Sequence, residues 1–425
     1  MGTRFDAIIV GAGPAGATAA ALLARAGWSV ALVEKQSFPR RKVCGECIAA
    51  SNLALLDAIG IGTRFAELAG PELRRVVLMH GADAVAAALP AGQHPGHRHG
   101  RALGREALDT LLLNQARSSG AQVFQPASVQ AIEGDPGAWR CTLRGPPGAD
   151  AVVLESRCVI AANGSWEALP SERLPRRERR AASDLFAFKA NFNSAAIAPG
   201  DLAVLGFAGG YGGMVQADAG ITTVACCIRR DRLDAMRRST PDVAAGAAVQ
   251  ALLEREVAGV KATLAPAQRD GPWLAAGPLA PGIRLRSDDR ILRIGNAAGE
   301  AHPIIGEGMS MALQSAWLLA GLLIASTLPG STPPPDLAAV YARRWRREFA
   351  PRLALAAGFA HLAMRPAGAG ALIALARRWP GLLTQGARWG GKVRCAVDRA
   401  TIQAHDTRSD RSCGPAAADR VKATP

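Results

Sequence analysis

The sequence predicts an α/β protein with an inserted α+β unit and a C-terminal helical part, and three observations predict this class. A glycine-rich turn joins a buried strand to a helix within residues 7–26. Strand-like segments with short connections fill residues 187–228, which is typical of an antiparallel sheet. Basic, Ala-rich helices are expected over residues 341–378. With 425 residues, the chain is long for one core, so two or three structural units are expected.

The N-terminal turn has the spacing of a dinucleotide-binding site of Rossmann type. The apolar run 7–10 predicts a buried parallel strand, and GAGPAG follows it at once. Gly11 permits the tight turn, Gly13 leaves room for a pyrophosphate, and Gly16 lets the helix pack closely on the strand. Pro14 and Ala15 lie between these glycines, where free N–H groups of the helix point at the phosphates.

An acidic residue completes this pattern. Residues 28–33 predict a second strand, and Glu34 stands at its end, where a carboxylate accepts hydrogen bonds from ribose hydroxyls. The alternative is a structural turn in an unrelated α/β protein, but strand, glycines, helix, strand and acid together argue against it. The sequence therefore predicts a nucleotide cofactor.

A basic cluster and a cysteine pair follow. Arg40, Arg41 and Lys42 form either a solvated loop or a phosphate clamp, in which Arg41 is the best single candidate. Cys44 and Cys47 have C-x-x-C spacing, but no second pair of cysteines or histidines completes a zinc site, so no metal is expected. The turn from Cys44 to Glu46 is predicted to place a thiol and a carboxylate near the cofactor.

Bulk properties narrow the classes further. The formal net charge of +15 allows contact with nucleic acid, an anionic membrane or an acidic partner, but no nucleic-acid motif stands out. Eight scattered cysteines and an N-terminus that enters a strand directly favour a reduced, cytoplasmic protein. The apolar helix over residues 309–328 carries Ser310, Gln314 and Ser315, which favours a buried helix over a membrane span.

The middle of the chain predicts further strands and loops. A helix is expected over residues 101–116. Residues 93–100, with three of the seven histidines, predict a loop that is either exposed or at the edge of the active site. The sequence also predicts a hairpin of 139–143 with 151–154, a charged linker at 173–180, a bulged segment at 206–213, a helix at 232–260 and a disordered tail from about 401. The other predicted strands cover 73–88, 121–124, 128–132, 158–162, 187–192, 202–207, 213–216, 221–228 and 289–295.

Several of these segments together resemble the FAD-dependent superfamily of p-hydroxybenzoate hydroxylase. The resemblance rests on GAGPAG with Glu34, on Arg105 in a helix, on the strand and turn at 160–164, and on the loop GNAAG with PIIGEG at 295–308. It implies an FAD-binding domain (1–72, 98–166, 283–330), a substrate domain whose antiparallel sheet covers the flavin (73–97, 167–282), a C-terminal helical region (331–400) and a tail (401–425).

Within that superfamily, two segments are similar to geranylgeranyl reductases and their relatives. These are Cys44 to Glu46 and the run GGYG that contains Tyr211, while residues 185–230 resemble flavoproteins that accompany type III polyketide synthases. The chain has Asn163 and Asn296 where the family has Asp, and Gly212 follows Tyr211 where the prenyl reductases have Trp. The W-x-W-x-I-P element of tryptophan halogenases is missing from the sequence.

The resemblance also implies roles for particular residues. Arg41 and Arg105 would hold the FAD phosphates, Glu34 with Lys35 the adenosine ribose, and the main chain at Val129 the adenine. The catalytic candidates are Cys44, Glu46 and Tyr211. The remaining cofactor-binding candidates are Gly11, Gly13, Pro14, Ala15, Gly16, Asn296, Gly306, Gly308 and Met309.

Three functions follow from this resemblance. The first is an FAD-dependent monooxygenase that hydroxylates an apolar phenolic or polyketide-like molecule, with NADPH or NADH, or a separate reductase, as the source of electrons. The second is a flavin-dependent reductase of isoprenoid or polyketide double bonds, with peripheral membrane contact through the C-terminal helices. The third is a flavoprotein that modifies or docks on a partner polypeptide. Oxygen dependence of turnover separates the first two.

Overall fold

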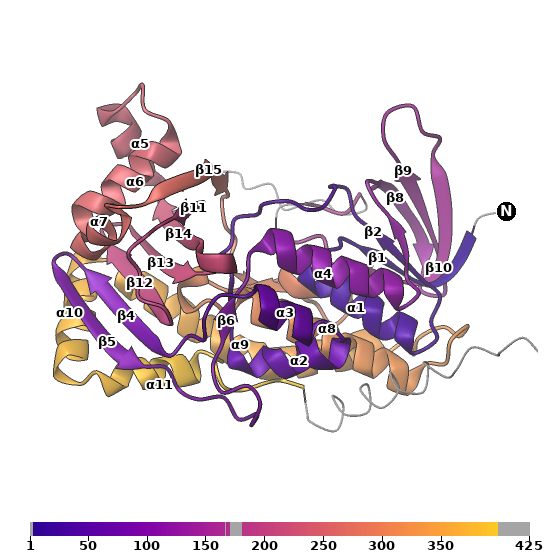
Figure 1. Cartoon of the computed structure of the whole chain (residues 1–425). Coiled ribbons are helices and arrows are strands. Elements are labelled where there is room, and N and C mark those ends of the chain that lie inside the picture. Colours follow the sequence, from indigo (N-terminus) through magenta and orange to yellow (C-terminus); the bar gives the residue numbers. More distant parts are fainter. Residues whose placement is uncertain (1–2, 166, 171–180, 398–425) are drawn as a thin grey trace, which may run out of the picture.

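A computed structural model describes residues 3–165, 167–170 and 181–397 of the chain, in which two large sheets stand side by side (Figure 1). The predicted linker at 173–180 and the tail from 401 lie outside the described residues. Helices α1 and α4 cover the first sheet, α5 to α7 gather at the far side of the second, and α10 and α11 lie below the second sheet (Figure 1).

The first sheet combines parallel and antiparallel strands. Its order is β7 (Gln122–Phe124), β2 (Val30–Val33), β1 (Thr3–Val10), β10 (Val152–Ala161), β9 (Ala138–Arg144), β8 (Ser128–Asp135), and β17 (Leu292–Arg293) pairs with β10. The predicted separation of 151–154 from 158–162 is wrong, because β10 is one continuous strand. Its first half pairs with β9 and nearly its whole length pairs in parallel with β1, so a single strand serves both neighbours.

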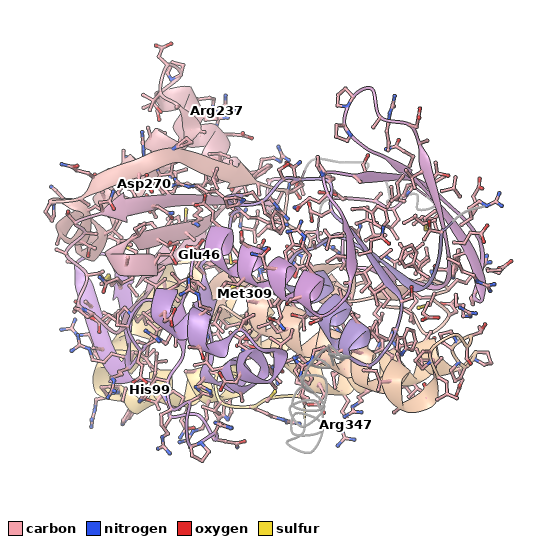
Figure 2. The ribbon with its side chains drawn as sticks, turned by 45° about the vertical axis from the view of Figure 1, so that its right-hand side comes forward. Glu46, His99, Arg237, Asp270, Met309 and Arg347 are labelled. Carbon is pink, nitrogen blue, oxygen red and sulfur yellow. The ribbon has the colours of Figure 1, made fainter. Side chains whose placement is uncertain are left out.

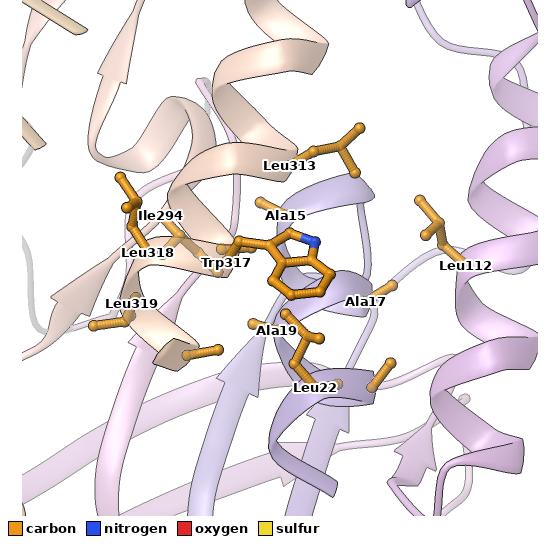
Figure 3. Close-up of a cluster of buried hydrophobic side chains, with 14 of the residues drawn as sticks. Ala15, Ala17, Ala19, Leu22, Leu112, Ile294, Leu313, Trp317, Leu318 and Leu319 are labelled. Atoms are coloured by element: carbon orange, nitrogen blue, oxygen red, sulfur yellow. The ribbon is translucent and has the colours of Figure 1, made fainter. Parts of the chain in front are cut away.

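The core beneath this sheet is built from small and branched side chains. Helix α1 (Pro14–Arg25) is Ala-rich, which lets α4 (Arg105–Ser118) and α8 (Gly308–Ser326) pack closely on it. Trp317 of α8 is 1% exposed and lies among Ala15, Ala17, Leu22 and other apolar residues (Figure 3). Helix α8 has the length and apolarity of a membrane span, yet 72% of that stretch is buried within the protein. The prediction of a buried helix is confirmed.

The second sheet is antiparallel except at one pair of strands. Its order is β15 (Gln268–Ala276), β11 (Leu185–Asn193), β14 (Thr222–Arg229), β13 (Gly210–Gln216), β12 (Asp201–Phe207), β4 (Arg75–His80), β5 (Asp83–Ala88), with β12 and β4 parallel. The predicted bulge at 206–213 is wrong. Strands β12 and β13 pair without a register shift, because Ala208 and Gly209 form a two-residue turn and Gly209 takes φ +74°.

The helical stretch expected at 232–260 is divided into three helices: α5 (Arg230–Ser239), α6 (Ala245–Glu256) and α7 (Ala258–Leu264). Pro241 explains the first break, because proline disfavours helical backbone in the residue before it, and Thr240 has φ −139° and ψ 66°. Val257 is extended at the second break.

The C-terminal part consists of α9 (Leu337–Ala363), α10 (Pro366–Arg378) and α11 (Gly381–Trp389), of which α11 was not predicted. Helix α10 contacts β4, β5 and β12, and α11 contacts β5, so both lie against the second sheet (Figure 1). The remaining elements are short: α2 (Leu53–Ile59), α3 (Gly62–Leu68), β3 (Cys47–Ile48) with β6 (Arg101–Ala102), β16 (Gly282–Ile283) with β18 (Gly299–Glu300), and 3-10 turns at Ala50–Asn52, Asp218–Gly220, Gly295–Ala297 and Pro303–Ile305.

Candidate functional site

One cavity of about 540 Å³ runs from the N-terminal turn to the C-terminal helices. Glu46 and Met309, which belong to its wall, lie at the middle of the molecule between the two sheets (Figure 2). The wall near the first sheet is contributed by Gly13, Pro14, Ala15, Lys42, Cys44, Glu46, Arg105, Gly164, Ser165, Gly295, Asn296, Gly306, Gly308 and Met309. Most of the cofactor-binding residues predicted from sequence therefore meet in one place.

The N-terminal turn has a backbone that only glycine tolerates. Gly11 has φ +102°, and a Cβ there would lie 2.5 Å from the carbonyl oxygen of Ala162. At Gly16 a Cβ would lie 1.8 Å from the carbonyl oxygen of Gly11. The N-terminus of α1 carries no side-chain cap, so its N–H groups are free to bind a phosphate.

Glu34 lies where a ribose-binding acid is expected. Its side chain is buried, and its carboxylate accepts hydrogen bonds from the N–H groups of Ala12 and Gln36, each at 2.9 Å. Arg40 approaches the same carboxylate at 3.6 Å. These contacts hold the carboxylate against the glycine turn.

Two cations line the cavity near its glycines: Arg105 lies close to Gly13, and Lys42, which was not the preferred candidate, lies close to Gly164. The Arg105 guanidinium lies 3.9 Å from the position of a Cβ at Gly13, and Asp109 holds it through two hydrogen bonds of 2.7 Å. The Lys42 amine lies 3.7 Å from the position of a Cβ at Gly164. Burial, then the charges of Arg105 and Arg40, lower the pKa of Lys42 to about 8.

The prediction of Arg41 as the phosphate clamp is wrong. Its guanidinium donates to Glu106 at 2.9 Å and to Asp270 at 2.8 Å, and the residue does not line the cavity. Two carboxylates saturate this cation and tie the loop to strand β15. Lys42 is the member of the basic cluster that faces the cavity.

Five further predicted residues lie outside the cavity wall: Gly11, Gly16 and Glu34, described above, and Lys35 and Val129. Lys35 forms an ion pair of 2.8 Å with Glu167. Val129 lies on β8, where the pairing with β9 shifts register between Val129 and Ala131. Their predicted roles at the adenosine end stay predictions.

The loop before α8 forms the opposite end of the cofactor region. Gly306 has φ +61°, and nothing lies within 4 Å of a Cβ placed at Gly308, so the N-terminus of α8 opens into the cavity. The amide of Asn296 donates to Ser165 Oγ at 2.8 Å. Asn296, which stands where the family has Asp, is therefore held in the cavity wall by Ser165.

Glu46 lies in a buried network of an ion pair and hydrogen bonds, and its predicted role as an acid or base stays a prediction. Its buried carboxylate accepts hydrogen bonds from the Lys189 ammonium, from the Thr223 hydroxyl and from the N–H of Arg105. Lys189 is itself 1% exposed. Through these bonds Glu46 connects its own turn, which begins at Cys44, to the start of α4 and to strands β11 and β14 of the second sheet. Its φ of +58° shows that the chain accepts strain to place this carboxylate.

Cys44 and Tyr211 both line the cavity, as predicted, but their surroundings differ. The Cys44 sulfur accepts the N–H of Glu46 at 3.3 Å, which stabilises the turn. The Tyr211 hydroxyl lies 3.3 Å from His302 Nδ1 and beside Cys227, and burial raises the pKa of Tyr211 well above its usual value. His302 was not among the predicted site residues.

His302 connects Tyr211 to the surface. Its ring centroid lies 5.7 Å from that of His361, which is exposed on α9. Burial, and to a smaller extent the His361 charge, lower the pKa of His302 to about 4, so the ring is neutral near pH 7. A neutral imidazole beside a buried hydroxyl is suited to move a proton.

The far end of the cavity is apolar and was missed in the sequence. The aliphatic side chains that form it come from β4, β12, α10 and α11, and they include Val76, Leu78, Leu202, Val204, Leu372, Leu375, Leu382 and Leu383. The residues of α10 and α11 are more than 60 positions beyond the last glycine motif, so no local pattern points to them. The sequence signal that could have indicated this apolar wall is the amphipathic repeat of Leu and Ala in the C-terminal helices.

The residues of the first sheet fit a bound FAD. The free N-terminus of α1 and two cations, Lys42 and Arg105, converge where a pyrophosphate would lie, and Glu34 is placed for the ribose. Lys42 lacks a carboxylate partner among the described residues, and an anion would supply one. The loop from Gly306 to Met309 would then lie at the ring end of the flavin.

Comparison with known proteins agrees with this geometry. The FAD binding domain family matches residues 4–352. A menaquinone reductase of Mycobacterium tuberculosis is 32% identical over 177 residues, which is 41% of this chain and 41% of that relative. The matched stretch thus spans about two fifths of the relative.

Two solved structures share the fold. The myxobacterial chondrochloren halogenase has a TM-score of 0.74 at 18% identity, with 96% of this chain and 97% of that chain covered. A probable FAD-dependent monooxygenase from Pseudomonas aeruginosa has a TM-score of 0.65 at 18% identity, with 87% and 99% covered.

The family match spans most of the chain, and the glycine turn, Glu34 and Arg105 that it includes have the geometry of a nucleotide site. This chain belongs to the FAD binding domain family.

Proposed function

We propose that this protein is a monooxygenase that hydroxylates a phenolic or polyketide-like molecule with a long apolar part. The observation that carries the proposal is the cavity, which continues from the flavin region into a channel of aliphatic side chains from β4, β12, α10 and α11. Such a channel favours burial of a hydrocarbon chain, at about 0.8 kcal/mol for each CH₂ group. Bound FAD supplies the two-electron chemistry and the activation of dioxygen.

The residues of the chain would prepare the substrate for this reaction. Tyr211 lines the cavity, and its hydroxyl can accept the proton of a phenol while donating its own to His302 Nδ1. His361, exposed beside His302, would pass the proton to solvent. Loss of the phenol proton makes the ring more electron-rich, which hydroxylation requires, and the apolar wall excludes water.

The test is turnover of 4-alkylphenols by the purified flavoprotein under ¹⁸O₂. The proposal predicts reduction of the flavin by NADPH or NADH, or by an added reductase, and a product that gains one ¹⁸O atom. Tyr211→Phe should lower kcat by about tenfold to a hundredfold, in the range usual for a positioned acid–base group. A product without ¹⁸O, or reduction of a substrate double bond without oxygen, would refute hydroxylation.

A second candidate is a reductase of double bonds in an isoprenoid or polyketide chain. The similarity to menaquinone reductases, together with Cys44 in the cavity wall, favours it. The same preparation decides between the two. A reductase would consume reduced nicotinamide under nitrogen with a prenylated quinone and would add two hydrogen atoms to the product.

A further inference from the structure

The surface of the C-terminal helices is unusually apolar. Of the eleven large hydrophobic side chains that are exposed among the described residues, five lie within positions 362–389. Trp379 is 55% exposed and Trp389 is 67% exposed, and the other members of this group are Leu362, Leu375 and Leu382. Soluble surfaces seldom gather apolar side chains in this way, and such patches mark contact with a partner or a membrane.

The same side chains surround the mouth of the cavity. Leu375, Leu382 and Trp389 are exposed and also line the cavity, so the channel opens between α10 and α11. We name the set Leu375, Trp379, Leu382 and Trp389 the apolar rim. A molecule that enters the channel at this mouth passes the apolar rim.

The charged side chains of the chain segment that carries the apolar rim are all positive, and Arg377 within it pairs with Asp83 of β5 at 2.9 Å. Residues 349–397 contain seven Arg and Lys residues and neither Asp nor Glu. Some of these cations are used internally, as with Arg352, which pairs with Glu307. Arg378 and Arg388 are exposed, and within the described residues neither pairs with a carboxylate; Arg378 lies 5.3 Å from the ring centroid of Trp379.

We propose that the apolar rim docks on an anionic phospholipid bilayer and that the apolar substrate enters the channel from the lipid. Trp side chains prefer the membrane interface because they join a large apolar ring to an N–H donor. Each Arg near an anionic surface adds about 1 kcal/mol of binding. Apolar burial and charge together give the reversible binding of a peripheral protein, independent of which reaction the flavin catalyses.

The test is co-sedimentation of the FAD-loaded protein with vesicles of phosphatidylcholine alone or with about one third phosphatidylglycerol. Wild type should bind the anionic vesicles and dissociate at high salt. Arg378→Glu/Arg388→Glu and Trp379→Ser/Trp389→Ser should each weaken binding by about tenfold or more. The matched control is Arg237→Glu/Arg238→Glu on α5, at the opposite end of the molecule, which should bind like wild type (Figure 2).

Flavin absorbance and the thermal midpoint show that each variant is folded, and a variant that fails either is replaced by the single change Trp389→Ser or Arg388→Glu. Equal loss of binding in the control, or wild-type binding by both rim variants, would overturn the proposal. Equal binding of wild type to neutral vesicles would overturn its electrostatic part. A dimer that is broken by Trp379→Ser/Trp389→Ser would assign the apolar rim to a second copy of the chain instead.

Discussion

Buried charge at the junction of the two sheets consists of individual side chains with different partners. Lys42 faces the glycine turn beside another cation, Arg41 is neutralised by two carboxylates, and Glu46 accepts from Lys189. The three side chains lie within six positions of one another, yet their surroundings differ. Lys42 is available to a ligand, whereas Arg41 and Glu46 form ion pairs that stabilise the fold. Each assignment has a measurable consequence.

Lys42→Met is expected to weaken FAD binding by about tenfold to a hundredfold, because a charge-assisted hydrogen bond to a phosphate contributes about 1.5 to 3 kcal/mol. The apoprotein should be at least as stable as wild type, because the repulsion from Arg105 and Arg40 is removed. Titration of apoprotein by quenching of flavin fluorescence measures the affinity. Arg41→Met serves as control and should leave FAD affinity unchanged; the reverse order of the two variants would contradict the assignment.

Glu46→Gln is expected to lower the free energy of unfolding by about 3 kcal/mol, because it leaves the buried Lys189 ammonium without its carboxylate. Glu46→Gln/Lys189→Met should recover part of this loss. Urea unfolding followed by flavin fluorescence and by circular dichroism measures both variants. A Glu46→Gln protein with wild-type stability but no turnover would instead support the predicted acid–base role.

His302 makes stability depend on pH. The unfolded imidazole binds a proton below about pH 6.5, whereas the folded one does so only below about pH 4. Between these values the unfolded state binds more protons, so this contribution to stability falls as the pH falls. Relative to His302→Gln, wild type should lose about 2 kcal/mol from pH 7 to pH 4. Parallel pH curves for the two proteins would contradict the lowered pKa of His302.

At the scale of elements, the channel is closed by helices that approach the sheet through small residues. On α11, Gly386 lines the cavity, and the nearest atom to a Cβ placed there is a ring carbon of Phe359 at 3.8 Å. A larger side chain at this position therefore enters the channel without a clash at its first carbon.

Gly386→Leu is expected to raise KM for long-chain substrates and leave it unchanged for short ones. The substitution should also stabilise α11 by about 1 kcal/mol, because leucine favours helix over glycine. A series of 4-alkylphenols of increasing chain length measures the selectivity. Gln385→Leu adds the same side chain at the neighbouring exposed position and is the matched control. An equal effect in both variants would show that the channel does not hold the chain.

At the scale of the whole molecule, the cavity is lined by residues from parts of the chain that are distant in sequence. Gly13, Lys42, Arg105 and Met309 surround the cofactor region. Buried Glu307, next to that region, pairs with Arg352 at 3.4 Å and Lys392 at 3.7 Å. The C-terminal region is thereby tied to the loop that would face the flavin ring.

Removal of FAD is expected to lower the thermal midpoint of the whole chain, and readdition to restore it. At an FAD concentration about 100 times Kd, the ligand contributes about 2.7 kcal/mol. Differential scanning calorimetry of apoprotein with FAD or with riboflavin measures this effect. Riboflavin lacks the pyrophosphate that would meet Lys42 and Arg105, so it should stabilise much less. Equal stabilisation by both ligands would contradict the assigned phosphate site.

The sequence by itself determined the features that depend on local chemistry. The GAGPAG turn, the acid at Glu34, the strands β11 to β14 of the second sheet and the buried character of α8 follow from glycine geometry and apolar periodicity within about 30 residues. Strand β15 was not predicted. The breaks that divide residues 232–260 into separate helices, such as the one at Thr240, were harder to predict, because the residues on both sides of each break favour helix.

Tertiary structure alone decided the rest, because burial and pairing join residues that are remote in the chain. Glu46 meets Lys189 across 143 positions, and Arg41 meets Asp270 across 229, so neither assignment was available from spacing. His302 lies 3.3 Å from the hydroxyl of Tyr211 on β13, which is 91 positions away in the chain. The apolar channel exists only where α10 and α11 fold back on β4 and β5.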